Sequence, residues 1–369
     1  MATQLVANGF DLSVYHAAPS TASGENYEAS PLALRSSANL QLHRFAPVLP
    51  GRLPGHYVRE ARELSEHFLR RYLAYPSSDL IYAKGLMADA FLKARARDKL
   101  ALPPIITNIH GYESFQQPAT MMERLRSAIL KPAFRSVIQQ SDYVVSYGGR
   151  ITELLHTKLD VPSSRILEFS GAVDERFLSD VTPSVVSRPR RFAFVGRYER
   201  RKGLEELAQV LQRQHGTDFE FHVVGPIPER VQRLFPPNVT FHGSVSDRDA
   251  LVSLLDSFDV LVCPSWSEGM PNVIMEAMAR NTAVIATDVG ATSLLVDSAN
   301  GELIPARNSH ALHEAIYRMT QNGDERLAAM KSASNLRIRK RFTWSTLSPA
   351  LAQRLSGLAS KGQAVRRGA

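Results

Sequence analysis

Residues 264–279 read PSWSEGMPNVIMEAMA, and this stretch decides the fold class of the chain. The apolar run Val260–Cys263 comes directly before it and is typical of a buried strand, which Pro264 ends. The run Val273–Ala279 consists mainly of good helix formers, so the order is strand, loop and helix. Such an arrangement directs unpaired backbone N–H groups and the positive end of a helix dipole at one point above the loop. It therefore favours an anion there, such as a phosphate.

Two carboxylates flank the turn-forming part of this loop. Glu268 lies in the loop and Glu276 lies about one turn inside the predicted helix, with seven residues between them. Two glutamates at this separation are common, and a glutamate near a helix start is usually a favourable partner of the dipole. The pair therefore indicates a functional site only together with the rest of the sequence.

Other fragments accompany the pair in a fixed order along the chain. They are GAVDERF (171–177), FVGRYERRKGLEEL (194–207), FHGSVSDRDALVSLLDSFDVLVCPS (241–265) and TDVGATSLLVDSANGELIP (287–305). With these fragments the chain resembles the retaining, nucleotide-sugar-dependent glycosyltransferases of family four (glycosyl transferases group 1), whose signature is Glu-x7-Glu. The resemblance spans the chain from about Leu5 to Leu355. It implies an α/β GT-B fold, in which two Rossmann-like domains with parallel sheets face each other across a donor-binding cleft.

Length and composition agree with two domains. The 369 residues are 44% hydrophobic, which is enough for two cores in domains of ~150 residues each. The single cysteine, Cys263, excludes an internal disulfide and, at the end of an apolar strand, indicates a buried thiol in a reducing compartment. No apolar run approaches the ~20 residues that cross a bilayer, and no signal peptide opens the sequence. We therefore expect a cytoplasmic protein.

The net charge of +8 calls for an anionic partner. Nucleic acid is disfavoured because the sequence has no RRM, helix-turn-helix or zinc-ligand signature. The segment MMERLRSAILKPAFR (121–135) interleaves apolar and basic residues, a pattern typical of helices that lie on anionic membranes. Enzymes similar to this chain often use lipid-linked acceptors, which favours peripheral contact with the inner face of a membrane. An ordinary surface helix whose apolar face packs on a sheet explains the segment as well.

Strand-like runs alternate with helical patterns along the chain and predict βαβ units. We expect an N-terminal acceptor-side domain over 1–180, a linker rich in Pro, Ser and Arg over 181–190, and a C-terminal nucleotide-sugar-binding domain over 191–340. A terminal helix over 341–358 is expected to pack back on the first domain. The chain opens on a helix end, Gly9 and a strand, whereas similar enzymes place a first strand and a glycine-rich loop earlier. We expect a late assigned start or, as the alternative, a real loss of that part.

The resemblance assigns roles in the C-terminal domain. Charge builds on the diphosphate of a nucleotide-sugar donor as it leaves, and fixed cations stabilise that charge. Arg197 and Lys202 are expected to bind the diphosphate beside Gly196, while Glu276 accepts hydrogen bonds from the ribose and Glu268 lies beside the donor sugar. The nucleobase is expected over the turn 243–246. The remaining donor-binding residues are Val245, Gly269, Met270, Pro271 (which has no N–H to donate), Asn272 and Val273.

In the N-terminal domain, His110 follows the predicted strand 105–109. Strand ends at the crevice of such sheets bind ligands, and similar enzymes carry a histidine here that contacts the donor sugar. A strand-end histidine on its own is more often structural. Glu113 is a candidate for acceptor binding.

The segment Asp247-Arg248-Asp249 looks like the Asp-x-Asp metal motif of a different glycosyltransferase fold. Ser246 with Asp249 three residues later instead predicts a helix cap. No other carboxylate or histidine cluster has metal-ligand spacing, so we expect no metal and no cofactor beyond the donor. Asn281 and Leu294 depart from the usual family pattern and mark a divergent member.

These features predict a retaining hexosyltransferase that moves a sugar from a UDP- or GDP-sugar to a hydroxyl of a saccharide or lipid-linked acceptor. Cell-surface polysaccharide or glycolipid synthesis is the generic role of such enzymes. Two other hypotheses remain open: a non-catalytic partner subunit that binds the sugar nucleotide, and a nucleotide-sugar epimerase on the same fold.

Overall fold

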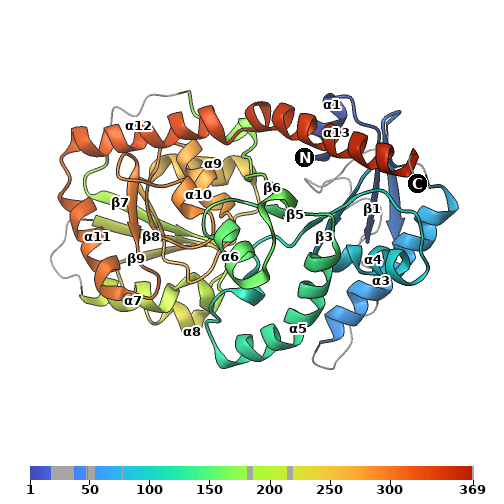
Figure 1. Ribbon diagram of the computed structural model, residues 1–369. Coiled ribbons are helices and arrows are strands. Elements are labelled where there is room, and N and C mark those ends of the chain that lie inside the picture. Colours follow the sequence, from blue (N-terminus) through green and yellow to red (C-terminus); the bar gives the residue numbers. More distant parts are fainter. Residues whose placement is uncertain are drawn as a thin grey trace.

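Two α/β domains lie side by side in the computed structural model (Figure 1). The structure describes residues 1–17, 37–46, 48, 55–76, 78–180, 186–213 and 219–367, with side chains to residue 361. Each domain is built on parallel strands with helices on both faces, as the alternation of strands and helices predicts. The α/β class and the two Rossmann-like domains are confirmed.

The N-terminal domain contains two parallel sheets, β1-β2 and β3-β4-β5-β6. Among the described residues, no hydrogen-bonded strand pair joins them. Leu12 of β1 nevertheless packs in one hydrophobic cluster with Leu80 and Tyr82, and Tyr15 packs in another with Ala83. The two sheets therefore share the same cores. The elements are α1 Ala2–Ala7, β1 Leu12–Ala17, β2 Leu40–Phe45, α3 His56–Ala74, β3 Ile81–Lys84, η1 Gly85–Ala88, α4 Asp89–Arg97, β4 Ile105–Asn108, η2 Glu113–Phe115, α5 Met121–Gln140, β5 Tyr143–Ser146, α6 Arg150–Leu159, η3 Ser163–Arg165, β6 Ile166–Glu168 and η4 Glu175–Phe177.

The C-terminal domain is built on one six-stranded parallel sheet in the order β12-β11-β10-β7-β8-β9. Its inner strands β10 and β11 are buried along their whole length, which explains why they read as unbroken apolar runs. The elements are β7 Arg190–Val195, η5 Arg200–Lys202, α7 Leu204–Arg213, β8 Phe219–Val224, α8 Glu229–Gln232, β9 Val239–Gly243, α9 Arg248–Ser257, β10 Val260–Cys263, α10 Asn272–Ala279, β11 Ala283–Thr287, η6 Thr292–Leu294, β12 Gly301–Ile304, α11 Ser309–Gln321 and α12 Asp324–Arg341.

A final helix, α13 (Trp344–Arg367), joins the two domains. It continues from the end of α12 and runs along the top of the N-terminal domain in Figure 1. Leu351 and Leu355 of α13 are buried in one cluster with Ile106 and Val145 of the N-terminal sheet. The sequence places the start of this helix three residues too early, at 341.

Several expected boundaries shift in the structure. Strand β7 begins at Arg190, the last residue of the predicted linker, and residues 181–185 of that linker lie outside the described residues. Strands β2 and β12 were not predicted from the sequence. β12 begins on a glycine and keeps two half-exposed residues, so its apolar signal is weak.

The predicted basic amphipathic segment forms the first part of α5. Thr120 caps this helix by accepting a hydrogen bond from the Glu123 N–H at 3.0 Å. In the described part of the chain, no helix combines the length and apolarity that crossing a membrane requires.

Candidate donor-binding site

The loops after β7 and β10 meet at the centre of the C-terminal sheet. These two strands are neighbours, and the strand order reverses between them, so their carboxyl ends open a crevice in which doubly wound sheets bind ligands. The loop after β7 carries Lys202, and the loop after β10 carries Glu268. Two residues far apart in sequence thus come together at this crevice.

The two loops are fixed to each other through their backbones. The Trp266 N–H donates to the Arg201 carbonyl at 2.7 Å. Gly203 has φ +74°, and a Cβ added there would lie 2.2 Å from the Pro264 carbonyl oxygen. Only glycine permits both this backbone conformation and this close approach, which explains the glycine directly after Lys202.

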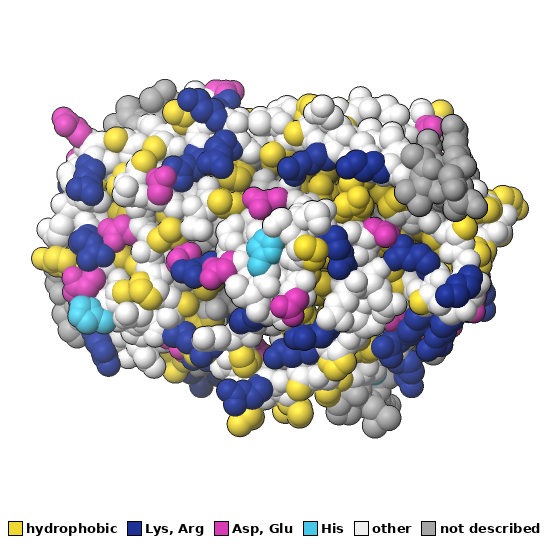
Figure 2. Space-filling model, viewed as in Figure 1, with side chains coloured by type: hydrophobic (Ala, Val, Ile, Leu, Met, Phe, Trp, Pro, Cys, Tyr) yellow, Lys and Arg dark blue, Asp and Glu magenta, His cyan; other side chains and the backbone are white. Residues whose placement is uncertain are grey.

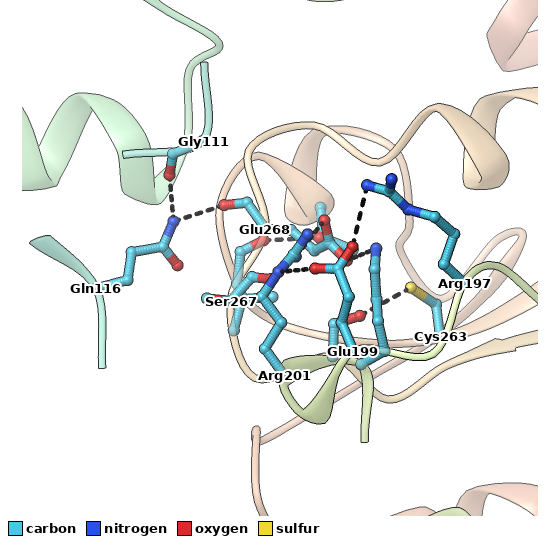
Figure 3. Close-up of polar contacts among 12 residues, drawn as sticks. Gly111, Gln116, Arg197, Glu199, Arg201, Cys263, Ser267 and Glu268 are labelled. Carbon is cyan, nitrogen blue, oxygen red and sulfur yellow. Dashed lines mark hydrogen bonds and ion pairs between the residues drawn. The ribbon is translucent and has the colours of Figure 1, made fainter. Parts of the chain in front are cut away.

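Glu268 is the centre of a buried charge cluster (Figure 3). Its Oε1 lies 2.6 Å from Lys202 Nζ, and its Oε2 lies 3.4 Å from Arg201 Nη1. Arg201 Nη1 also donates to the Ser267 carbonyl at 3.0 Å. Only 6% of Glu268 is exposed, so these cations compensate a carboxylate that water barely reaches.

Arg197, which the sequence assigns to the diphosphate, lies at the edge of this cluster. Its side chain is 79% exposed and its Nη2 lies 3.1 Å from Glu199 Oε1. The other oxygen of Glu199 accepts a hydrogen bond from Arg201 Nε at 2.8 Å. Arg197 is thus linked to the cluster through Glu199. Arg201, the second cation at Glu268, was not predicted, because three consecutive basic residues do not reveal which of them point inward.

The start of α10 offers unpaired hydrogen-bond donors beside Glu268. Among the described residues, no acceptor contacts the backbone N–H groups of Gly269, Met270, Asn272 and Val273. The predicted residue Pro271 precedes the first helical residue and has no N–H. The four donors together form a cradle for an anion or for sugar oxygens.

Glu276 lies one turn further along α10 and is half-buried. It has no hydrogen-bond or ion-pair partner among the described residues. Burial raises the pKa of its carboxyl, although the nearby Arg248 guanidinium acts in the opposite direction. A desolvated carboxylate without a partner is an available acceptor for hydroxyl groups.

Glycine turns line the ends of β7, β8 and β9 on the other side of the crevice. The Gly196 N–H donates to the Val224 carbonyl at 2.9 Å, and the Gly225 N–H donates to the Gly243 carbonyl at 2.7 Å. Val245 follows this last turn and packs partly buried against the core beneath α9 and α10. The turn expected to hold the nucleobase is therefore linked to Gly196 through Gly225 at the end of β8.

His110 lies at the carboxyl end of β4 in the N-terminal domain, with φ +51°. Its Nδ1 lies 2.8 Å from the Tyr147 hydroxyl, and its N–H donates to Asn108 Oδ1 at 2.8 Å. Desolvation and the neighbouring Lys84 ammonium lower its pKa, so the imidazole is neutral at pH 7.

The two domains touch directly over the loop that carries Glu268. The Gln116 amide donates both to the Gly111 carbonyl of its own domain and to the Glu268 carbonyl of the other, the latter at 2.7 Å (Figure 3). A Cβ added to Gly269 would lie 2.8 Å from Gly111 Cα. Arg307 of the C-terminal domain donates to the Pro118 carbonyl at 2.7 Å. The segment 111–118 therefore closes the cleft from the N-terminal side, and nothing in the sequence indicated Gln116.

The Asp-x-Asp segment is a helix cap, with a correction to the capping residue. Asp247 Oδ2, and not the side chain of Ser246, accepts a hydrogen bond from the Ala250 N–H at 2.7 Å at the start of α9. Within the described ranges, no group of three or more His, Cys, Asp or Glu side chains could hold a metal ion.

Two Rossmann-like domains, with the N-terminal one facing the switch-point crevice of the C-terminal sheet, define the GT-B fold. Residues 189–322 match the family model described as glycosyl transferases group 1. A sucrose-phosphate synthase from Thermosynechococcus elongatus has the same fold, with a TM-score of 0.79 and 18% identity over 97% of this chain and 91% of that one.

Two further proteins extend the comparison. The putative teichuronic acid biosynthesis glycosyltransferase TuaC of Bacillus subtilis strain 168 is 29% identical over 252 residues, which are 66% of this chain and 61% of that protein. The structure of Anabaena HepE in complex with UDP and glucose matches with a TM-score of 0.63 and 17% identity over 86% of each chain. Residues 189–322 of the chain are thus similar to group 1 domains, and its structural neighbours include a protein that binds UDP and a sugar.

Proposed function

We propose that the protein is a retaining glycosyltransferase of family four that transfers a hexose from a UDP- or GDP-sugar to a hydroxyl of a saccharide or lipid-linked acceptor. The observation that carries the proposal is the buried Glu268–Lys202 pair beside the unpaired N–H groups that open α10. Fixed cations, aligned N–H donors and a carboxylate at one switch-point crevice suit a ligand that combines a diphosphate with a polyol. The match of residues 189–322 to the group 1 model supports the same assignment.

In the proposed reaction the anomeric C–O bond of the donor breaks, and the nucleoside diphosphate leaves with the electron pair. The acceptor oxygen forms the new C–O bond on the same face, and its proton passes to the leaving phosphate. Lys202 and Arg197 would stabilise the developing phosphate charge, since each oriented donor in a desolvated site contributes ~10²–10³ in rate. No metal or other cofactor takes part in this proposal, so activity should withstand a chelator.

On the donor side we propose that Glu276 binds the ribose hydroxyls, and that Glu268 and the N–H groups of Gly269, Met270, Asn272 and Val273 bind sugar and phosphate oxygens. The base would lie over the turn 243–246, which includes Val245, and the diphosphate beside Gly196. His110 would contact the sugar from the opposite domain. A neutral imidazole suits this role because it both donates and accepts hydrogen bonds.

We further propose a role in cell-surface polysaccharide or glycolipid synthesis at the cytoplasmic face of a membrane. The relative TuaC is named for a polysaccharide, teichuronic acid, which supports such a role. The surface through which the protein would reach the membrane is developed in the next subsection.

Thermal stabilisation by UDP, GDP and ADP tests this proposal and distinguishes it from the alternatives. A ligand at a hundredfold excess over Kd raises the stability of the folded state by about 2.7 kcal/mol. The proposal predicts stabilisation by UDP or GDP and loss of that stabilisation in Lys202→Met. Stabilisation without turnover on any acceptor would favour the non-catalytic subunit, and conversion of the donor without acceptor would favour the epimerase. No stabilisation by any nucleotide would overturn the assignment.

A further inference from the structure

The surface of α5 combines features that a helix packed only within its own domain does not need. Met121, Met122, Leu125 and Ile129 follow one another along one side of this helix, and their exposed fractions are 76%, 59%, 56% and 36%. The second half of the helix, with Ala133, Val137 and Ile138, is buried in the cores of the domain. The first half of α5 is therefore exposed with its apolar side chains uncovered, whereas its second half packs in the domain. We call the four exposed residues the α5 stripe.

Cations without ion-pair partners surround the α5 stripe. Helix α5 carries three more cations than carboxylates, and its single carboxylate, Glu123, accepts a hydrogen bond from the Ala119 N–H. In the part of the chain that the structure describes, none of Arg124, Arg126 and Lys131 pairs with a carboxylate. Many arginines of the C-terminal domain do form such pairs. Unpaired cations beside an exposed apolar stripe suit a partner that is anionic at its surface and apolar beneath it.

A groove between α3 and α5 extends this surface. Its volume is about 900 Å³, and Ile129 and Pro132 of α5 form one wall. Three arginines of α3 line the opposite wall, namely Arg59, Arg62 and Arg70. Two α3 glutamates, Glu63 and Glu66, line it as well, so the groove has a small cationic excess, and most of the excess charge lies on α5. Arginine side chains can bind phosphate oxygens in a bidentate manner, which suits phosphodiester head groups.

Figure 2 shows the same surface from outside. Hydrophobic side chains protrude at the lower edge of the molecule, where α5 lies in Figure 1, and Lys and Arg side chains lie beside them. No described helix could cross a bilayer. Contact with a membrane would therefore be through such a surface, with the stripe among the head groups and acyl chains and the arginines on the phosphates.

We propose that the α5 stripe and the α3–α5 groove bind the surface of an anionic phospholipid bilayer, with the arginines of the groove holding lipid phosphates. The position of α5 relative to the cleft connects this membrane contact with the proposed active site. Met121 follows Gln116 by five residues, and Gln116 donates across the cleft to the Glu268 carbonyl. A bilayer on α5 would thus lie next to the segment that closes the cleft. The inference deepens the proposed peripheral location and does not depend on glycosyl transfer.

Flotation of the full chain with lipid vesicles tests the proposal. We expect binding to phosphatidylcholine vesicles with about 30% phosphatidylglycerol and at least tenfold weaker binding to phosphatidylcholine alone, since each cation near an anionic surface contributes about fivefold. Raising the salt from about 0.1 M to about 1 M shortens the Debye length about threefold and should release most of the bound protein.

A matched pair of double variants locates the contact. Leu125→Gln with Arg126→Gln should weaken vesicle binding at least tenfold. The same types of change in α12, Leu336→Gln with Lys340→Gln, should leave binding unchanged, because α12 lies on the opposite edge of the molecule (Figure 1). Neither pair lies in the proposed donor site, so both variants should retain their thermal stabilisation by nucleotide.

Three outcomes would overturn the proposal. Equal binding to zwitterionic and anionic vesicles would show that the arginines do not bind lipid phosphates. An equal loss of vesicle binding in both double variants would show that α5 is not the contact surface. Absence of vesicle binding, together with a dimer in solution that Leu125→Gln dissociates, would assign the stripe to a second copy of the chain. Because vesicle binding needs no donor and nucleotide stabilisation needs no lipid, a failure of either proposal is seen separately from a failure of the other.

Discussion

Replacing Gly290 by alanine is the most direct perturbation of the loop that carries Glu268. Gly290 follows β11 with φ +58°, and an added Cβ would lie 2.3 Å from the Gly269 carbonyl oxygen and 2.4 Å from the Glu268 carbonyl oxygen. Real Cβ contacts essentially never fall below 3.0 Å, and both obstacles are backbone atoms, so the loop itself must move. The left-handed conformation adds a cost of about 1–2 kcal/mol for alanine.

We expect Gly290→Ala to lower the free energy of unfolding by about 2–4 kcal/mol, the sum of the strained conformation and the displaced carbonyls. In a domain of this size that corresponds to a Tm about 5–12 °C lower. A displacement of the Glu268 loop on the order of 1 Å should also reduce kcat/KM about 10²-fold. Differential scanning fluorimetry and donor turnover measure the two effects.

The matched control is Gly357→Ala in the exposed part of α13, where an added Cβ has no atom within 4 Å. Removing a glycine from a helix interior should raise stability by about 0.5–1 kcal/mol and leave turnover unchanged. If Gly290→Ala keeps both the Tm and the kcat/KM of the unchanged protein, the loop is not held as the structure indicates. The geometric basis of the proposed site would then be wrong.

Three further predictions concern the residues around the cleft. Lys202→Met should lower stability by about 1–3 kcal/mol because it leaves the buried Glu268 carboxylate with Arg201 alone, and adding Glu268→Gln should restore part of that loss in a double-mutant cycle followed by urea unfolding. Burial raises the pKa of Glu276 in the folded state, so its ionised form opposes folding above that pKa. Glu276→Gln should therefore raise the Tm at pH 7, with a gain that fades toward pH ~4, and should reduce the stabilisation by nucleotide. Gln116→Leu leaves two carbonyl groups without their donor and should lower kcat/KM at least ~10-fold while the Tm falls by only a few degrees, which separates positioning from folding.

The sequence predicted secondary structure best where the residues that determine an element are close together in the chain. The strand, loop and helix from Val260 to Ala279 follow from an apolar run, a proline and a group of helix formers, and the structure has them within one residue. The class of the fold follows from the alternation of such units. The strand β12 was missed because its four residues begin on a glycine and are not uniformly buried, so neither alternation nor an apolar run marks them.

The candidate site was less predictable because its contacts join distant parts of the chain. The Glu268–Lys202 contact depends on β7 and β10 being neighbours, which no local pattern specifies, and only the family resemblance placed the two residues together. Gln116 donates to backbone carbonyl groups. Every residue has such a group, so the sequence cannot show which residues Gln116 contacts. For the same reason the carbonyl that Arg201 binds could not indicate which arginine of the turn points inward.

Lys202 is already paired with Glu268 in the absence of a donor. The second cation at Glu268, Arg201, explains how a donor diphosphate could still bind Lys202. A diphosphate that attracts Lys202 competes with the Glu268 carboxylate for it, and a carboxylate with only 6% exposure would be costly to leave without a partner. Arg201 lies 3.4 Å from the other carboxylate oxygen and is fixed by Glu199 and by the Ser267 carbonyl. It can therefore remain as a cationic partner of Glu268 while Lys202 turns to the phosphates. A lysine at position 201 lacks the guanidinium fork that reaches Glu268, Glu199 and the Ser267 carbonyl. We therefore expect Arg201→Lys to reduce the increase in stability on nucleotide binding by more than it lowers the stability of the nucleotide-free protein.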